Sequence, residues 1–112
     1  MRRFTIPLAI AGMALGLASL GAARADDEYV LTIQNNRFEP TELAIPIDTK
    51  VQITVKNLDQ AAEEFESSDL NREKVVVGGG QIKVFVGPLP AGTYEFFGDF
   101  HPDTARGHIV VR

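Results

Sequence analysis

Two short runs in this sequence hold the residue types best suited to chemistry. One is acidic, Glu63-Glu64-Phe65-Glu66, and the other carries a histidine between two aspartates, Asp99-Phe100-His101-Pro102-Asp103. An imidazole combined with two or three carboxylates is a hard, oxygen-rich ligand set that suits Fe(II), Mn(II), Zn(II) or Cu(II) better than Cu(I). If the fold brings the two runs together, they would form a site for a divalent transition-metal ion.

The chain has no cysteine, and this absence excludes several kinds of chemistry. Thiol nucleophiles, thiolate metal ligands and redox-active disulfides are all ruled out. A hydrolase that uses His101 is also disfavoured, because no serine or cysteine nucleophile stands near a base. With 112 residues and no internal repeat, the sequence predicts a single domain held together by its apolar core alone.

The segments that must position these runs alternate with a period of two, which is typical of half-buried strands. Val51, Ile53 and Val55, for example, alternate with polar neighbours. Turn-forming residues separate the predicted strands, which cover residues 29–33, 42–47, 51–56, 74–77, 82–86, 93–97 and 107–111. About seven short strands in one small domain predict an all-β, Greek-key β-sandwich. Residues 59–73 lack clean alternation and are predicted to form a loop or a short helical turn, and residues 78–80 a hairpin turn.

The N-terminus predicts an export signal. Met1-Arg2-Arg3 supplies positive charge, residues 6–20 are largely apolar, and Ala23-Arg24-Ala25 is a small-x-small cleavage motif. The apolar stretch of about 15 residues is shorter than the ~20 that span a bilayer. We therefore expect residues 1–25 to be removed as a signal peptide and residues 26–112 to form a periplasmic domain.

Cleavage at that point would leave an acidic domain. Lys+Arg falls from 11 to 8 while Asp+Glu stays at 15, so the formal net charge changes from −4 to −7. Nucleic acids and anionic lipids attract proteins whose positive charge neutralises them, so neither is expected as a partner. The acidity either favours cations or simply keeps a small exported domain in solution.

The order of motifs along residues 26–112 resembles that of the cupredoxin family. In chain order the motifs are Phe38-x-Pro40, a strand ending in Asn57-x-Asp59, Pro90-x-Gly92-x-Tyr94, the histidine loop, and a closing strand that starts at Gly107. Tyr94 would then be a tyrosine-corner residue whose hydroxyl caps the backbone. The resemblance implies a cupredoxin-like sandwich in which the loops after Asn57 and after residues 93–97 meet at one end.

In blue-copper members of that family a cysteine, two histidines and a methionine bind the copper ion. Carried over to this sequence, the cysteine position falls on Gly98, the loop histidine on His101, the methionine on or near Ala105, and the first histidine on Glu63 or Glu64. Three of the four ligands are therefore missing, and without a thiolate a blue-copper centre cannot form. The resemblance thus implies a colourless protein that is not a plastocyanin-like electron carrier.

The runs Glu-Glu-Phe-Glu-Ser and Phe-Phe-Gly-Asp-Phe-His-Pro-Asp are similar to a subgroup of cupredoxin-like proteins associated with bacterial iron-permease systems. That similarity implies a periplasmic accessory protein of ferrous iron uptake that binds iron or copper and at most assists iron oxidation. Its implied partners are an inner-membrane iron permease and a periplasmic iron-binding protein, and a homodimer could complete the coordination shell. The implied metal ligands are His101, Glu64, Glu66, Asp99 and Glu63.

Strand geometry limits which of those carboxylates can point together. Successive side chains of a strand alternate between its faces, so Glu64 and Glu66 would share one face, and Glu63 and Phe65 the other. The acidic run could instead be a solvated face, and the domain a metal-free module that docks onto a permease or another partner. Three aromatic residues are interpreted as core and site wall, and the second histidine is predicted on the surface: Phe96, Phe97, Phe100 and His108.

Overall fold

The computed structural model describes residue 24 and residues 27–112, and these residues form strands and turns without a helix. Within them the nine strands are β1 (Tyr29–Gln34), β2 (Arg37–Glu39), β3 (Glu42–Ile45), β4 (Val51–Asn57), β5 (Glu63–Ser67), β6 (Arg72–Val76), β7 (Gln81–Val86), β8 (Gly92–Gly98) and β9 (Arg106–Val111). The predicted signal peptide lies outside the described residues, apart from Arg24. In the described part of the chain, no helix is long and apolar enough to cross a membrane.

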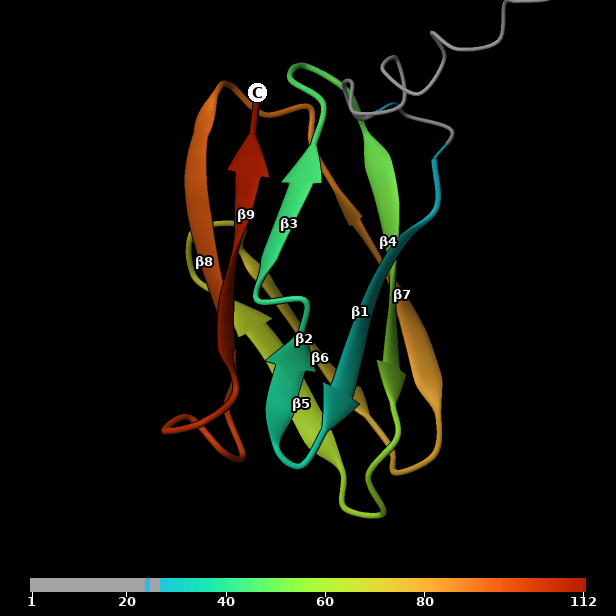
Figure 1. Ribbon diagram of the computed structural model, residues 1–112. Helices are drawn as coiled ribbons and strands as arrows, with labels where there is room; N and C mark the ends of the chain where they lie inside the picture. Colours follow the sequence, from blue (N-terminus) through green and yellow to red (C-terminus); the bar gives the residue numbers. More distant parts are fainter. Residues whose placement is uncertain (1–23, 25–26) are drawn as a thin grey trace, which may run out of the picture.

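The strands form two sheets that face each other, as Figure 1 shows. One sheet has the order β2-β1-β4-β7 and the other the order β3-β9-β8-β5-β6. The pairs β1 with β4 and β3 with β9 are parallel, whereas all other neighbours are antiparallel. The chain therefore crosses between the two layers several times, as in a Greek-key sandwich. The all-β sandwich that the alternation predicts is confirmed.

Two predictions for the middle of the chain are wrong. Residues 59–73 contain strand β5 and the first residues of β6 instead of a loop or helical turn. The alternation is hidden there because β5 buries two polar side chains, Glu63 and Ser67, beside Phe65 on its inner face. Residues 78–80 connect β6 to β7, which belong to different sheets, so this turn crosses between the layers and closes no hairpin.

Three phenylalanines from three different strands form the centre of the core. Phe38 meets Phe65 and Phe96 edge-on, with ring centroids 6.1 and 4.9 Å away, and the Phe65 and Phe96 centroids lie 5.4 Å apart. All three side chains are at most 1% exposed. Edge-to-face aromatic pairs contribute stability beyond the burial of their area. Because Phe38 lies in one sheet and the other two rings in the second, this cluster holds the layers together.

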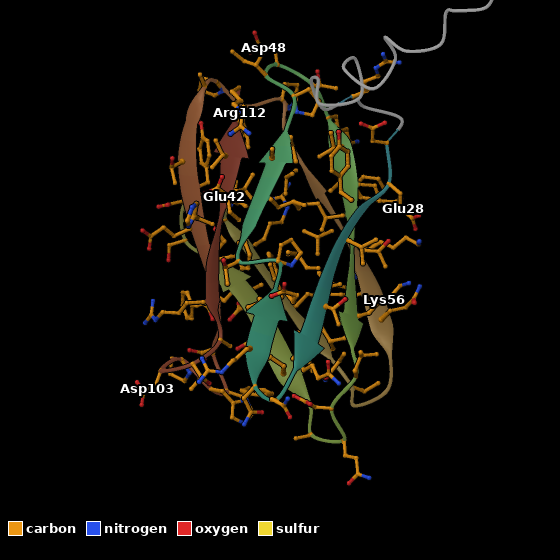
Figure 2. The ribbon with its side chains drawn as sticks, in the orientation of Figure 1. Glu28, Glu42, Asp48, Lys56, Asp103 and Arg112 are labelled. Carbon is orange, nitrogen blue, oxygen red and sulfur yellow. The ribbon has the colours of Figure 1, made fainter. Side chains whose placement is uncertain are left out.

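One end of the sandwich gathers the β1–β2 turn, the β4–β5 loop and the β8–β9 loop, opposite the C-terminus of the chain (Figure 1). The Asp59 carboxylate accepts hydrogen bonds from the backbone N–H groups of Asn35 and Asn36, at 2.8 and 2.9 Å. Thr104 donates its hydroxyl to the Asn36 carbonyl at 2.6 Å. Figure 2 shows Asp103 at this end, in the same loop. These contacts fix the loop that carries the candidate histidine.

Candidate metal site

Strand β5 divides the acidic run between its two faces. Glu63, Phe65 and Ser67 are buried, whereas Glu64 and Glu66 are half-buried on the outer surface of the sheet. The prediction that Glu64 and Glu66 share one face, and Glu63 and Phe65 the other, is confirmed. The candidate ligands therefore belong to two places, one inside the sandwich and one outside.

The inner place holds a pair formed by Glu63 and His101. Their side chains are 1% and 31% exposed, and the carboxylate Oε2 lies 2.7 Å from the imidazole Nδ1. The other carboxylate oxygen, Oε1, accepts the backbone N–H groups of Glu64 and Phe100, each at 2.8 Å. A turn presents the ring, since the His101 N–H donates to the Gly98 carbonyl at 3.1 Å. Both oxygens of this buried carboxylate therefore have hydrogen-bond partners that the protein itself supplies.

The geometry of the inner place shows whether a blue-copper ion, which the fold implies, would fit between these residues. A Cβ atom placed on Gly98 would lie 2.5 Å from the Glu63 carboxyl carbon and 2.8 Å from the Cβ of Ala105. Of the four positions that correspond to copper ligands, only Glu63 and His101 carry donor atoms, and these two already bind each other. The residues present therefore do not fit a blue-copper ion.

The outer place is a cluster of carboxylates on the exposed face of the five-stranded sheet. Oxygens of Glu64, Glu66 and Asp99 lie within 4.8 Å of one another, and among the described residues His101 is not part of this group. The backbone brings Asp99 there, because its N–H donates to the Glu64 carbonyl at 2.9 Å. Oxygen donors bound to one ion at about 2.1 Å lie up to about 4 Å apart. Small side-chain rotations would therefore bring these three carboxylates to a shared ion.

Partial burial and neighbouring negative charges raise the pKa values of two carboxylates in the outer cluster. Partial burial raises the pKa of Glu64, and the charges of Glu73 and Glu66, a hydrogen bond with Glu73 and the charge of Asp99 raise it further. Partial burial also raises the pKa of Glu66, followed by the charges of Asp99 and Glu73. Glu73 therefore belongs to the cluster, although the sequence analysis did not select it. The signal that identifies it is its position opposite Glu66 in the β5–β6 pair, which only the strand register reveals.

Replacing Glu66 by glutamine should stabilise the metal-free domain at neutral pH. Because folding raises the pKa of Glu66, its ionised form costs stability above the folded-state pKa. That cost disappears as the pH falls through this pKa towards the unfolded-state value of about 4.3. We therefore expect urea unfolding to give Glu66→Gln a higher stability than wild type at neutral pH, and a difference that shrinks towards about pH 4.

The matched control for this prediction is Glu28→Gln, which neutralises an exposed acid just before β1. Both variants lose one negative charge, so a general effect of net charge would appear in both. A lower stability of Glu66→Gln than of wild type at neutral pH would contradict the repulsion described above.

Two residues outside both places lie as the sequence predicts. His108, whose side chain is 39% exposed, pairs with Glu42 at 3.1 Å between Nε2 and Oε1. Tyr94 donates its hydroxyl to the Pro90 carbonyl at 2.8 Å, which is the hydrogen bond of a tyrosine corner. Tyr94 therefore caps the backbone and His108 lies at the surface.

These observations define the class of protein. A two-sheet sandwich whose β8–β9 loop sets a histidine against a buried side chain of β5 has the architecture of a cupredoxin-type domain. The sequence profile of the family described as "Cupredoxin-like domain" matches residues 7–111, and the chain belongs to this family. It is 45% identical over 84 residues to an uncharacterised protein of Rickettsia prowazekii (strain Madrid E), with 75% of this chain and 67% of that protein covered.

Solved structures share the fold at low sequence identity. Auracyanin A, a blue copper protein of Chloroflexus aurantiacus, matches with a TM-score of 0.67 at 16% identity, over 77% of this chain and 98% of that one. A purple cupredoxin from Nitrosopumilus maritimus gives 0.61 at 21% identity, over 76% and 100% of the two chains. Amicyanin from Paracoccus versutus gives 0.62 at 17% identity, over 78% and 83%. Structural similarity at these identities establishes the fold of this chain. It does not establish that the chain has the metal chemistry of those proteins.

Proposed function

We propose that this protein is a metal-binding accessory protein of periplasmic iron uptake, which holds its ion at the outer carboxylates Glu64, Glu66 and Asp99. The observation that supports this most directly is the grouping of their oxygens within 4.8 Å on one face of the sheet. Carboxylates are hard oxygen donors of the kind that Fe(II) accepts. The raised pKa values of Glu64 and Glu66 add an electrostatic reason to take up a cation, because a bound ion would relieve the repulsion.

The position of the cluster suits an ion that is taken up and passed on. Asp99 is exposed, and Glu64 and Glu66 are only half-buried, so water would complete the coordination shell and a partner could reach the ion. In this proposal ferrous iron is cargo, and copper is the alternative ion. A second copy of the chain could supply further ligands to the open side of the shell.

The proposed partners are an inner-membrane iron permease and a periplasmic iron-binding protein. The similarity of the two chemical runs to cupredoxin-like proteins of iron-permease systems supports this choice. The predicted export signal in residues 1–25 supports the periplasmic location. The net charge of −7 expected after cleavage would also favour a cationic cargo over an anionic one.

Isothermal titration of the mature chain with Fe(II) under anaerobic conditions, and separately with Cu(II) and Zn(II), tests this function. We expect one ion to bind per chain. The variant Glu64→Gln/Glu66→Gln/Asp99→Asn should bind it at least about tenfold more weakly, because loss of even a residue that only hydrogen-bonds to a metal ligand weakens binding on that scale. The weakening follows because the three substitutions remove the anionic donors and leave neutral amides.

The control variant removes the same number of negative charges elsewhere: Glu28→Gln/Asp48→Asn/Asp103→Asn. All three side chains are exposed, as Figure 2 shows, and none of them belongs to the group of Glu64, Glu66 and Asp99. This variant should keep wild-type affinity. Equal affinity of both triple variants would show that the outer cluster is not the site, and no binding of any of the three metals by the wild type would refute the proposed function.

A further inference from the structure

The Glu63 carboxylate fills the inner pocket, which is the space between β5, Gly98 and the β8–β9 loop. It accepts hydrogen bonds from the N–H of Glu64 within β5 and from the N–H of Phe100 in the loop, and it shares a third with the ring of His101. These partners belong to strand β5, to the backbone of the β8–β9 loop and to a side chain of the same loop. One carboxylate joins all three, as a structural metal ion joins the segments that supply its ligands.

Room for this carboxylate exists because residue 98 is glycine. Gly98 pairs with Phe65 across the β5–β8 ladder, so a side chain at this position would point inward. Its Cβ would lie 2.5 Å from the carboxyl carbon of Glu63 and 2.6 Å from Oε2, closer than real Cβ contacts come. The carboxylate cannot turn aside without losing its hydrogen bonds. Glu63 in this position and a cysteine at position 98 are therefore mutually exclusive.

The hydrogen bond to Glu63 also occupies one of the two nitrogens of the imidazole. Oε1 of Glu63 receives two backbone N–H groups, which can only donate, and Oε2 shares a hydrogen bond with Nδ1 of His101. Whether it donates or accepts, a ring nitrogen engaged in this hydrogen bond has no lone pair free for a metal. The ring nitrogen that faces the pocket is thus unable to bind an ion while the pair is intact.

We infer that the pair formed by Glu63 and His101 replaces the metal ion of this fold and closes the inner pocket to metal. Glu63 is the positioning residue that holds the β8–β9 loop, and any ion bound by this chain lies outside the pocket. The inference is separate from the proposed iron site, because it rests on the inner pocket alone.

Nitrogen-15 NMR of the His101 ring during titration with Zn(II) tests this in the wild-type mature chain. Zinc is the probe because it binds imidazole and carboxylate ligands and has no redox chemistry. The Nδ1 signal is expected to keep its shift in a stoichiometric excess of Zn(II), whether or not the second ring nitrogen, Nε2, binds zinc outside the pocket. The variant Glu64→Gln/Glu66→Gln/Asp99→Asn should behave identically, so failure of the iron proposal does not alter this result. An Nδ1 signal that moves to the shift of a metal-bound nitrogen would overturn the inference.

A second test rebuilds the metal site by Glu63→His, Gly98→Cys and Ala105→Met together. This variant is expected to bind one Cu(II) and to gain an intense visible absorption band from thiolate-to-copper charge transfer, which wild type with Cu(II) lacks. The matched control carries Glu63→His and Ala105→Met but keeps Gly98, and should show no such band. A rebuilt variant with wild-type circular dichroism that shows no band with Cu(II) would overturn the inference. Where the rebuilt variant does not fold, the NMR result on wild type decides.

Discussion

Replacing Glu63 by alanine is expected to lower the free energy of unfolding by roughly 3–5 kcal/mol, because buried donors that lose their acceptor cost about 1–3 kcal/mol each. The substitution leaves the N–H groups of Glu64 and Phe100 and the ring of His101 without their shared acceptor. It also opens a cavity beside Gly98, where the carboxylate lies at present. Urea unfolding of wild type and variant, followed by circular dichroism, measures the difference.

The next residue along the same strand provides the control. Glu64→Ala removes the same side chain from the outer face, where its charge is repelled by neighbouring acids, and should leave stability unchanged or slightly higher at neutral pH. His101→Ala should cost less than Glu63→Ala, roughly 1–3 kcal/mol, because the carboxylate keeps its two backbone donors. Equal losses for Glu63→Ala and Glu64→Ala would contradict the inner pair as the source of the stability.

Replacing Phe65 by alanine should lower the free energy of unfolding by a similar amount, roughly 3–5 kcal/mol. The Phe65 side chain is 0% exposed and packs against Phe38 and Phe96 between the sheets. Its loss removes buried apolar area and two aromatic contacts, and the neighbouring strands limit collapse of the cavity. Thermal or urea unfolding monitored by circular dichroism gives the size of the effect.

Phe100→Ala is the comparison for that variant, because it deletes the same side chain at a position that is 49% exposed. Its effect should stay within about 0.5 kcal/mol, as for most surface substitutions. A loss at position 100 as large as that at position 65 would mean that the exposed ring belongs to the core.

The sandwich was predictable because most strands expose one face to water and bury the other. Tyr29, Leu31 and Ile33 in β1 are all buried, and such alternation needs no knowledge of the partner strand. Strand β5 was missed because its inner face carries two polar residues, Glu63 and Ser67, whose hydrogen-bond partners lie far along the chain. The alternation of apolar and polar residues does not reveal a polar residue that is buried together with its hydrogen-bond partner.

The candidate site was predictable in its faces and not in its contacts. The separation of Glu64 and Glu66 from Glu63 follows from the period of a strand alone. The pairing of Glu63 with His101, 38 residues later, depends on the path of the β8–β9 loop, which local sequence does not determine. Of the three aromatic residues interpreted as core and site wall, Phe96 is buried in β8 and Phe97 is half-buried. The interpretation is wrong for Phe100, which is 49% exposed in the turn after β8.

Strand β5 contributes one face to the core and the other to the acidic surface. Its alignment with β6 and β8 therefore determines both which residues are buried and which charges are exposed. Pairing fixes Glu63 opposite Val76 and Phe65 opposite Gly98. A slip by one residue would exchange the two faces, so that Glu64 and Glu66 turned inward and Phe65 turned to water. The same backbone hydrogen bonds that keep the core apolar therefore also keep the acidic patch at the surface, and neither property can change by a shift of this strand without loss of the other.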